Sequence, residues 1–451
     1  MPILPIDAGR YGSDEIKKIF DEKKRLDYQL EFEASVAEAQ AESGLIPSRA
    51  AEEISEKARS GKITVQRVKE LEAVSEHDTA ALVEAISELC SDGTKPWVHY
   101  GLTSYDVVDT GISMQIRDSL SVIEPKVTKL AFILAEKGVQ YKELPAVGRT
   151  HGQHASIISF GLKFAVWASD MANHVTRMKE MKKRVLVCKT LGVVGTGSLM
   201  GNNALEVQAL VAKKLNLHPI DAATQVVSRE RHSEFLFCLA LIASTLDKIA
   251  VEIRNLQRTE IGEVSEPFKE GQMGSSAVPV KRNPIKSERV SSLARMLTKM
   301  VDVSLENVTL WHERDLSNSA NERFTIPMSV ILLDEMLTSI IKVVSGLKID
   351  AKRISENLEF TKGRIYAEFV LDALVKKGMP RFDAYRVLQK TAFGAEEKGI
   401  HFLDALGNDK EISSRLSKDE LKAIFNPKNH LAASAKIIDG VTGMVKEVCT
   451  V

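Results

Sequence analysis

The strongest constraint on the fold is a set of six long stretches in which apolar residues recur at three- and four-residue steps. In the first stretch the pattern begins at Ile16, Ile19 and Phe20, and Gly44 ends it. A helix of about 25 residues is roughly 37 Å long and buries its apolar face only against neighbouring helices. The sequence therefore predicts an all-α fold with a central long-helix bundle. The six stretches cover residues 15–44, 107–136, 154–185, 233–259, 287–308 and 325–347.

The chain is longer than one ordinary domain. Its 451 residues can bury a large core and leave room for two or three domains. Beyond residue 350 the helical stretches become shorter and are separated by Gly and Pro. We therefore expect an N-terminal helical domain over residues 1–105, the central long-helix bundle over residues 106–350 and a C-terminal helical domain over residues 351–451.

The charge balance gives no general attraction to a polyanion. Lys plus Arg and Asp plus Glu each number 61, so neither nucleic acid nor a membrane is expected as a partner, and an anionic ligand requires local clusters. The longest mostly apolar block found, residues 235–246, is shorter than the roughly 20 residues that span a bilayer. The N-terminus has no basic region followed by a long apolar run, which indicates no signal peptide.

The four cysteines are scattered along the chain without Cys-x-x-Cys spacing. This distribution argues against a zinc site and against a disulfide framework. Free thiols are typical of a reducing compartment, so the expected localisation is cytoplasmic. The residues are Cys90, Cys188, Cys238 and Cys449.

The loop at residues 274–284, GSSAVPVKRNP, combines two hydroxyls, two cations and an amide. Glycine and proline on both sides interrupt regular structure, so this segment is expected to carry its polar groups to a ligand. A solvated surface loop is the alternative. The polar residues are Ser275, Ser276, Lys281, Arg282 and Asn283.

Further polar residues lie at the ends of the helical stretches or between them. Each has an ordinary alternative role: a lone histidine usually packs, and charges at a helix end are usually solvated. The spacing of His151 and His154 could suit a metal, but no third ligand is nearby, so no metal is expected. The residues are Arg10, Tyr11, His77, Asp78, His99, Thr103, Ser104, Thr150, His151, Gln225, Glu288, Arg289, Arg314, Ser319 and Arg323.

Taken in order along nearly the whole chain, these segments resemble the fumarase/aspartase superfamily. The loop's Lys-Arg-Asn-Pro ending, residues 281–284, resembles its adenylosuccinate lyase branch. The resemblance implies β-elimination of fumarate from adenylosuccinate, giving AMP, and from succinylaminoimidazole carboxamide ribotide (SAICAR), giving AICAR. It also implies a homotetramer with a shared multi-helix core and sites built from three subunits. No dinucleotide fingerprint or P-loop is visible in the sequence, so no cofactor is expected.

The resemblance also implies roles for individual residues. His151 would be the general acid and Ser275 the general base, although the residues alone do not separate Ser275 from Ser276. Thr103 and Ser104 would bind a succinyl carboxylate. The nucleotide phosphate would contact Arg10, Tyr11, Arg314, Ser319 and Arg323, and other substrate contacts would come from His77, Asp78, His99, Thr150, Gln225, Ser276, Lys281, Asn283, Glu288 and Arg289.

The chemistry explains why such groups occur together. Elimination removes a proton next to a carboxylate and expels an amine, so it needs one base and one acid. Negative charge that builds into the carboxylate must meet positioned cations and amides, a role suited to Lys281 and Asn283. A closing loop would bring these groups in and exclude water.

Four positions depart from the family pattern: Glu76, Val278, Val280 and Asn318. None of them removes a reacting group. The alternative activities are another fumarate-releasing lyase, such as one acting on argininosuccinate, and a non-catalytic helical scaffold. Only the adenylosuccinate interpretation gives a role to the phosphate-binding residues Arg10, Tyr11, Arg314 and Arg323.

Overall fold

The computed structural model describes residues 4–450, and this part of the chain is predominantly helical, with eighteen α-helices and six short strands. The all-α prediction is confirmed. The chain divides into two compact units. Unit 1 contains the chain up to Val127, His174–Leu246 and Ser292–Thr338, and unit 2 contains Thr128–Asn173, Asp247–Ser291 and the chain from Ser339 onward. The three domain ranges expected from the sequence stay a prediction.

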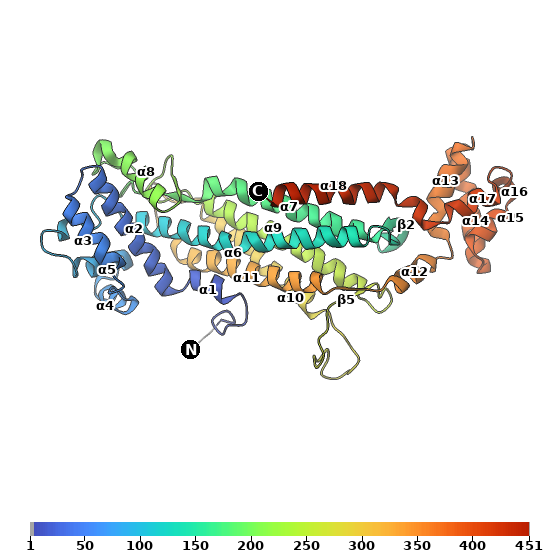
Figure 1. The fold of residues 1–451 in the computed structure, drawn as a ribbon, viewed down its shortest axis with the longest axis horizontal. Coiled ribbons are helices and arrows are strands. Elements are labelled where there is room, and N and C mark those ends of the chain that lie inside the picture. Colours follow the sequence, from blue (N-terminus) through green and yellow to red (C-terminus); the bar gives the residue numbers. More distant parts are fainter. Residues whose placement is uncertain (1–3, 451) are drawn as a thin grey trace. The chain divides into compact units, whose positions relative to one another are not determined.

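Five long helices form the framework, and each contributes residues to both units. Within unit 1, side-chain hydrogen bonds connect α6 with α7 and α11, α7 with α9, and α9 with α10. These contacts make the long helices a bundle, as the periodicity predicts. Figure 1 shows them as long ribbons: α6 (Ser104–Gln140), α7 (Phe160–Val185), α9 (Glu230–Leu256), α10 (Ile285–Glu306) and α11 (Ser319–Ser345).

The predicted helix over residues 15–44 is two helices, α1 (Asp14–Ile19) and α2 (Glu22–Glu42). The break lies at Phe20 and Asp21. The Asp21 carboxylate accepts a hydrogen bond from the backbone N–H of Lys24 at 2.6 Å, which caps a new helix N-terminus. Apolar spacing continues across the break, so periodicity alone did not detect it.

The helix predicted over residues 154–185 begins only at Phe160. Residues before it form an antiparallel hairpin of β1 (Pro145–Thr150) and β2 (Gln153–Ser159) in unit 2. Ile157 and Ile158 are β-branched residues that favour a strand, and Ile157 is buried together with Val147 of β1. The start of the predicted helix is therefore wrong by six residues.

The remaining helices of unit 1 are shorter. They pack mainly against α2 and against one another, and the last of them also contacts the parallel pair β3 (Val187–Cys188) and β4 (His218–Pro219). The buried Lys189 ammonium pairs with Asp106 of α6, so this region has an ionic contact as well as an apolar core. The helices are α3 (Ser48–Arg59), α4 (Val65–Ser75), α5 (Asp78–Ser87) and α8 (Ala204–Lys214).

Of the seven helices that the described chain forms after α11 in unit 2, the five within residues 367–424 pack around an apolar cluster that includes Val370, Leu374, Phe402 and Leu406. Two strands that come before these helices along the chain, β5 (Val264–Ser265) and β6 (Lys348–Ile349), form an antiparallel pair. The helices are α12 (Ala351–Glu359), α13 (Ala367–Lys376), α14 (Arg381–Lys398), α15 (Phe402–Asn408), α16 (Lys410–Ser413), α17 (Lys418–Ile424) and α18 (Ala432–Cys449).

Helix α11 (27 residues) is longer than the apolar block at residues 235–246. Among residues 4–450, it is the one helix whose length and composition would allow it to cross a membrane. However, 67% of its most apolar window is buried inside the protein. A core helix of a soluble protein has the same composition, so this feature is weak evidence for a membrane span.

Candidate active site

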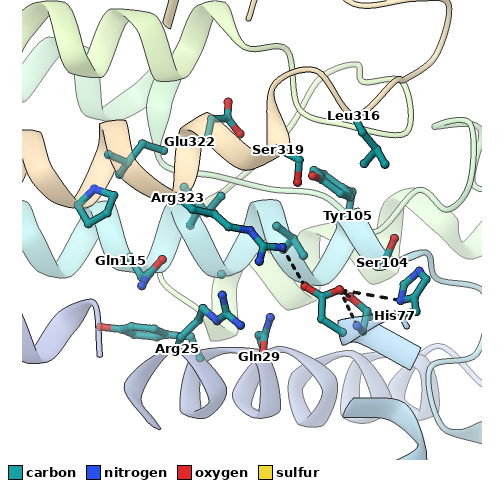
Figure 2. Close-up of a pocket in the computed structure, with 18 of the residues that line it drawn as sticks. Arg25, Gln29, His77, Ser104, Tyr105, Gln115, Leu316, Ser319, Glu322 and Arg323 are labelled. Atoms are coloured by element: carbon teal, nitrogen blue, oxygen red, sulfur yellow. Dashed lines mark hydrogen bonds and ion pairs between the residues drawn. The ribbon is translucent and has the colours of Figure 1, made fainter. Parts of the chain in front are cut away.

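A cavity of about 420 Å³ lies in unit 1, between α2, the N-terminal ends of α5 and α6, and the N-terminal end of α11. Figure 2 shows Ser319, Arg323 and Tyr105 on one side of it and Arg25 and Gln29 on the other. Six residues that the sequence analysis selected line this cavity: His77, Asp78, Ser104, Arg314, Ser319 and Arg323.

The N-terminus of α5 supplies the first polar group. His77 caps this helix, because its Nδ1 accepts a hydrogen bond from the backbone N–H of Ala80 at 3.2 Å. Asp78 follows in the first turn, where a carboxylate is favoured by the helix dipole. Its Oδ2 lies 3.3 Å from Nη2 of Arg323, so α5 and α11 are joined at the cavity.

The N-terminus of α11 supplies the positive charge. Ser319 is its first residue, and Arg323 lies one turn further on. Arg314 precedes the helix, and its Nη1 donates to Oε1 of Gln225 at 2.6 Å. The guanidinium carbon of Arg314 is 3.8 Å from the ring centroid of Tyr105. Two arginines beside a helix N-terminus provide a site suited to an anion.

A buried ionic network lies beside the N-terminus of α11. The Arg229 side chain is fully buried and pairs with Oδ1 of Asp109 at 2.9 Å and with Oε1 of Glu322 at 3.3 Å. Nδ1 of His232 also lies 3.3 Å from Oε1 of Glu322. Burial would raise the pKa of Glu322, but His232 and Arg229 outweigh it and the pKa is lowered. Arg229 is thus a structural ion-pair residue.

The turn before α6 is held in a fixed conformation. His99 has φ of 59°, and its Nδ1 lies 2.6 Å from Oε1 of the buried Glu33. Burial lowers the pKa of His99, but the Glu33 carboxylate outweighs this effect and the pKa is raised. The backbone N–H of Thr103 donates to Asp106 at 2.8 Å. His99 and Thr103 precede the lining residue Ser104 in the sequence, but they do not line the cavity themselves.

Three other selected residues of unit 1 also lie outside the cavity lining. The side-chain amide of Gln225 donates to Val193 O at 2.9 Å and accepts from Arg314, so it holds that arginine. The segment containing Arg10 and Tyr11 is anchored to α11, because the next backbone N–H groups donate to Glu335 and Asp334. Arg10 is exposed and Tyr11 is partly buried.

In unit 2, the β1–β2 hairpin presents His151. His151 and Gly152 form its two-residue turn with φ of 52° and 75°, the geometry of a type I′ turn. Arg149, one residue before Thr150 in β1, pairs with the buried Glu263 at 2.5 Å. Thr150 and His151 are both exposed at the end of this anchored hairpin.

His154 has a different environment from His151. Its ring centroid is 5.8 Å from that of Phe360, and its Nδ1 is buried without a hydrogen-bond partner. Burial, followed by the Arg149 guanidinium, lowers the pKa of His154. These features suit a packing residue. No group of three or more His, Cys, Asp and Glu side chains within the described chain is arranged to hold a metal ion.

The GSSAVPVKRNP loop lies between β5 and α10 in unit 2 (Figure 1). Oγ of Ser275 accepts from the backbone N–H groups of Ala277 and Val278, at 3.3 and 3.1 Å. Asn283 Nδ2 donates to Gly274 O at 2.9 Å, which closes the base of the loop. Ser276 and Lys281 are exposed. The loop is held at its base and open at its tip.

The selected residues therefore fall into two groups, one in each unit. Unit 2 contains Thr150, His151, Ser275, Ser276, Lys281, Asn283, Glu288 and Arg289, with the last two in the first turns of α10. Two residues that line the cavity, Tyr105 and Glu322, were not predicted from the sequence, and neither were the buried anchors Glu33 and Glu263. A carboxylate among apolar residues, as at Glu33, was the available signal for a buried partner.

Comparisons with known proteins agree with the arrangement of these segments. A family model described as Lyase matches residues 9–298, and one described as Adenylosuccinate lyase C-terminus matches residues 363–441. An adenylosuccinate lyase from Methanocaldococcus jannaschii is 42% identical over 447 residues, which are 99% of this chain and 96% of that protein. One from Pyrococcus horikoshii is 43% identical over 448 residues, 99% of each chain.

The fold comparison is consistent with these sequence matches. The crystal structure of 3-carboxy-cis,cis-muconate lactonizing enzyme from Pseudomonas putida matches with a TM-score of 0.89 and 28% identity, over 99% of this chain and 100% of that one. That enzyme's name describes a different reaction, so the fold by itself does not define the chemistry. The chain belongs to the adenylosuccinate lyase family, within the larger class of lyases that the first family model describes. This result confirms the resemblance seen in the sequence.

Proposed function

We propose that this protein is a carbon–nitrogen lyase that releases fumarate from adenylosuccinate, giving AMP, and from SAICAR, giving AICAR. The observation that carries this proposal is the anion site at the N-terminus of α11, where Arg314, Ser319 and Arg323 line one cavity. Both substrates contain a ribose phosphate, which suits two arginines and a helix N-terminus. The full-length similarity to adenylosuccinate lyases supports the same substrates.

In this proposal the catalytic groups come from two segments of unit 2, the β1–β2 hairpin and the GSSAVPVKRNP loop. Ser275 removes the proton next to the carboxylate, and His151 donates a proton to the leaving nitrogen. Lys281 and Asn283 stabilise the negative charge that develops on the carboxylate. Ser275 is a poor base unless it ionises, so closure of the loop and the nearby Lys281 are its proposed activators.

The remaining selected residues bind the substrate. Thr103 and Ser104 receive a succinyl carboxylate at the start of α6, where the helix dipole favours an anion. Arg10 and Tyr11 add to the phosphate site. We assign the other substrate contacts to His77, Asp78, His99, Thr150, Gln225, Ser276, Glu288 and Arg289.

Activity assays distinguish this proposal from the alternatives. The purified protein should convert adenylosuccinate to AMP and fumarate with no additive and with a metal chelator present. Cleavage of argininosuccinate but of neither purine substrate would indicate the other lyase, and no turnover of any of them would favour a non-catalytic scaffold. Complete dependence on an added metal would contradict the proposed mechanism.

We propose that the protein acts as a cytoplasmic homotetramer in which different subunits contribute His151 and Ser275 to one site. Family membership supports a shared site, because the resemblance implies sites built from three subunits, and His151 and Ser275 lie on two different segments, the β1–β2 hairpin and the loop before α10. No nucleic acid or membrane partner is proposed.

Subunit mixing tests the shared site. His151→Ala and Ser275→Ala should each be inactive, and random assembly of the two should restore about a quarter of the sites. Turnover is measured after the variants are dissociated and reassembled together, with each variant alone as the control. Mixed tetramers that remain inactive would show that one subunit supplies both residues, while the proposed reaction would stand.

A further inference from the structure

Arg314 differs from Arg323 and Arg229 in how its charge is held. Arg323 lies beside the Asp78 carboxylate, and Arg229 lies between Asp109 and Glu322. Within residues 4–450, no carboxylate lies within ion-pair distance of Arg314. It contacts the aromatic face of Tyr105 and the neutral amide of Gln225 instead. Its positive charge therefore remains available to a ligand.

The backbone does little to direct the Arg314 side chain. The residue lies in the irregular segment between α10 and α11, so its conformation depends on side-chain contacts. At 3.8 Å from the ring centroid, the guanidinium is well within the range of a cation–π interaction. Its Nε is buried without a hydrogen-bond partner, which agrees with a guanidinium that lies against an apolar ring.

Tyr105 itself is fixed. It is the second residue of α6, its exposure is 6%, and the guanidinium carbon of Arg229 is 5.7 Å from its ring centroid. The next residue, Asp106, pairs with the buried Lys189. Figure 2 shows the Tyr105 ring beside Ser319, at the wall of the cavity. A rigid ring at this point can hold a guanidinium in one orientation.

We propose that Tyr105 is a positioning residue: its ring holds the Arg314 guanidinium toward the cavity without neutralising it, so that Arg314 can bind the phosphate of a nucleotide. This inference rests on the proposed function and adds to it a residue that the sequence motifs do not include. The ring is required, and the hydroxyl is not.

A matched pair of variants tests the ring. Tyr105→Leu keeps an apolar side chain without a π face, and it should raise KM for adenylosuccinate about tenfold with kcat changed by less than about threefold. Tyr105→Phe keeps the ring and should restore the wild-type KM. Thermal unfolding of both variants serves as the folding control. A wild-type KM in Tyr105→Leu, or an equal loss in both variants, would overturn the proposal.

A double-mutant cycle tests whether Tyr105 acts through Arg314. Arg314→Ala removes the cation, so adding Tyr105→Leu to it should increase KM by less than about twofold further. Losses that multiply would mean that the two residues act independently, which would overturn the proposal.

Calorimetric titration with AMP repeats this cycle as a binding measurement, without turnover. If wild-type protein binds AMP but does not cleave adenylosuccinate, the proposed function is wrong and the positioning role of Tyr105 still stands. If Tyr105→Leu and wild type bind AMP with equal affinity, the positioning role is wrong and the proposed function still stands. Wild-type protein that fails to bind AMP would overturn both.

Discussion

The cavity of unit 1 and the GSSAVPVKRNP loop of unit 2 carry similar polar side chains but hold them in different ways. In the cavity, Glu322 and Asp78 have ionic partners on other elements, and Tyr105 supports Arg314. In the loop, the Ser275 hydroxyl accepts from the backbone N–H groups two and three residues further on, and it has no partner on another element of the described chain. Val280 at the loop tip is 87% exposed.

The difference indicates a division of tasks. Groups that are fixed by ionic or aromatic partners on other elements are organised before a ligand arrives, which suits recognition of a constant part of the substrate such as a phosphate. Groups on a loop with few tertiary contacts can move at low free-energy cost, which suits residues that must close over a reacting bond. Predictions that separate binding from turnover therefore test this comparison.

The largest expected effect is on turnover. Ser275→Ala should lower kcat by about a thousandfold while adenylosuccinate still binds, because the proposed base acts only in the reacting complex. Single-turnover kinetics and equilibrium binding measure the two quantities. Ser276→Ala is the matched control and should keep far more activity. The reverse order of the two variants would make Ser276 the base.

The next effect is on stability. Glu263→Ala should lower the free energy of unfolding by about 3 kcal/mol, because it leaves Arg149 and Asn357 without their buried partner. Denaturant titration measures this value. Glu260→Ala is the control, since its ion pair with Arg258 is exposed and should change stability by less than about 0.5 kcal/mol. Equal effects would show that the hairpin anchor is not important for folding.

A smaller effect is expected at the rim of the cavity. Arg323→Ala should raise KM about tenfold and leave kcat less affected, because it removes a phosphate contact that the substrate and the transition state share. Arg386 is also exposed and pairs with an aspartate, so Arg386→Ala is the control and should have wild-type kinetics. A loss mainly in kcat would assign Arg323 to the chemical step.

The smallest effect concerns pH. Because Glu33 raises the pKa of His99, protonation of His99 favours the folded state. The stabilisation is fully present below the unfolded pKa of about 6.5 and is lost as the pH rises through the higher folded pKa. The stability difference between wild type and Glu33→Gln should therefore be about 1 kcal/mol larger at low pH than at high pH.

Denaturant titrations of wild type and Glu33→Gln from pH 6 upward would measure this trend. Glu31, which pairs with Arg59 at the surface, provides the control: Glu31→Gln should keep the pH dependence of the wild type. If the difference in the free energy of unfolding between wild type and Glu33→Gln does not vary with pH, Glu33 does not raise the pKa of His99.

The sequence predicted the long helices because each must bury one face, and that requirement produces a visible period. The hairpin at residues 145–159 was missed, since its strands are short and join directly to α7. The ion-pair partner of Arg229 could not be predicted from the sequence either, because Asp109 lies 120 positions earlier and no local pattern connects the two residues. The catalytic assignments to Ser275 and His151 remain predictions.

The His151–Gly152 turn places two separate demands on one position. The backbone at residue 151 adopts a left-handed conformation, which glycine, asparagine and aspartate accept far better than a β-branched residue. The proposed chemistry requires an imidazole there. His151→Val would therefore distort the hairpin and remove the acid together, whereas His151→Asn would remove the acid from an intact turn. Over evolutionary time, a descendant that lost the reaction but kept the fold would be expected to accumulate asparagine or glycine at this site.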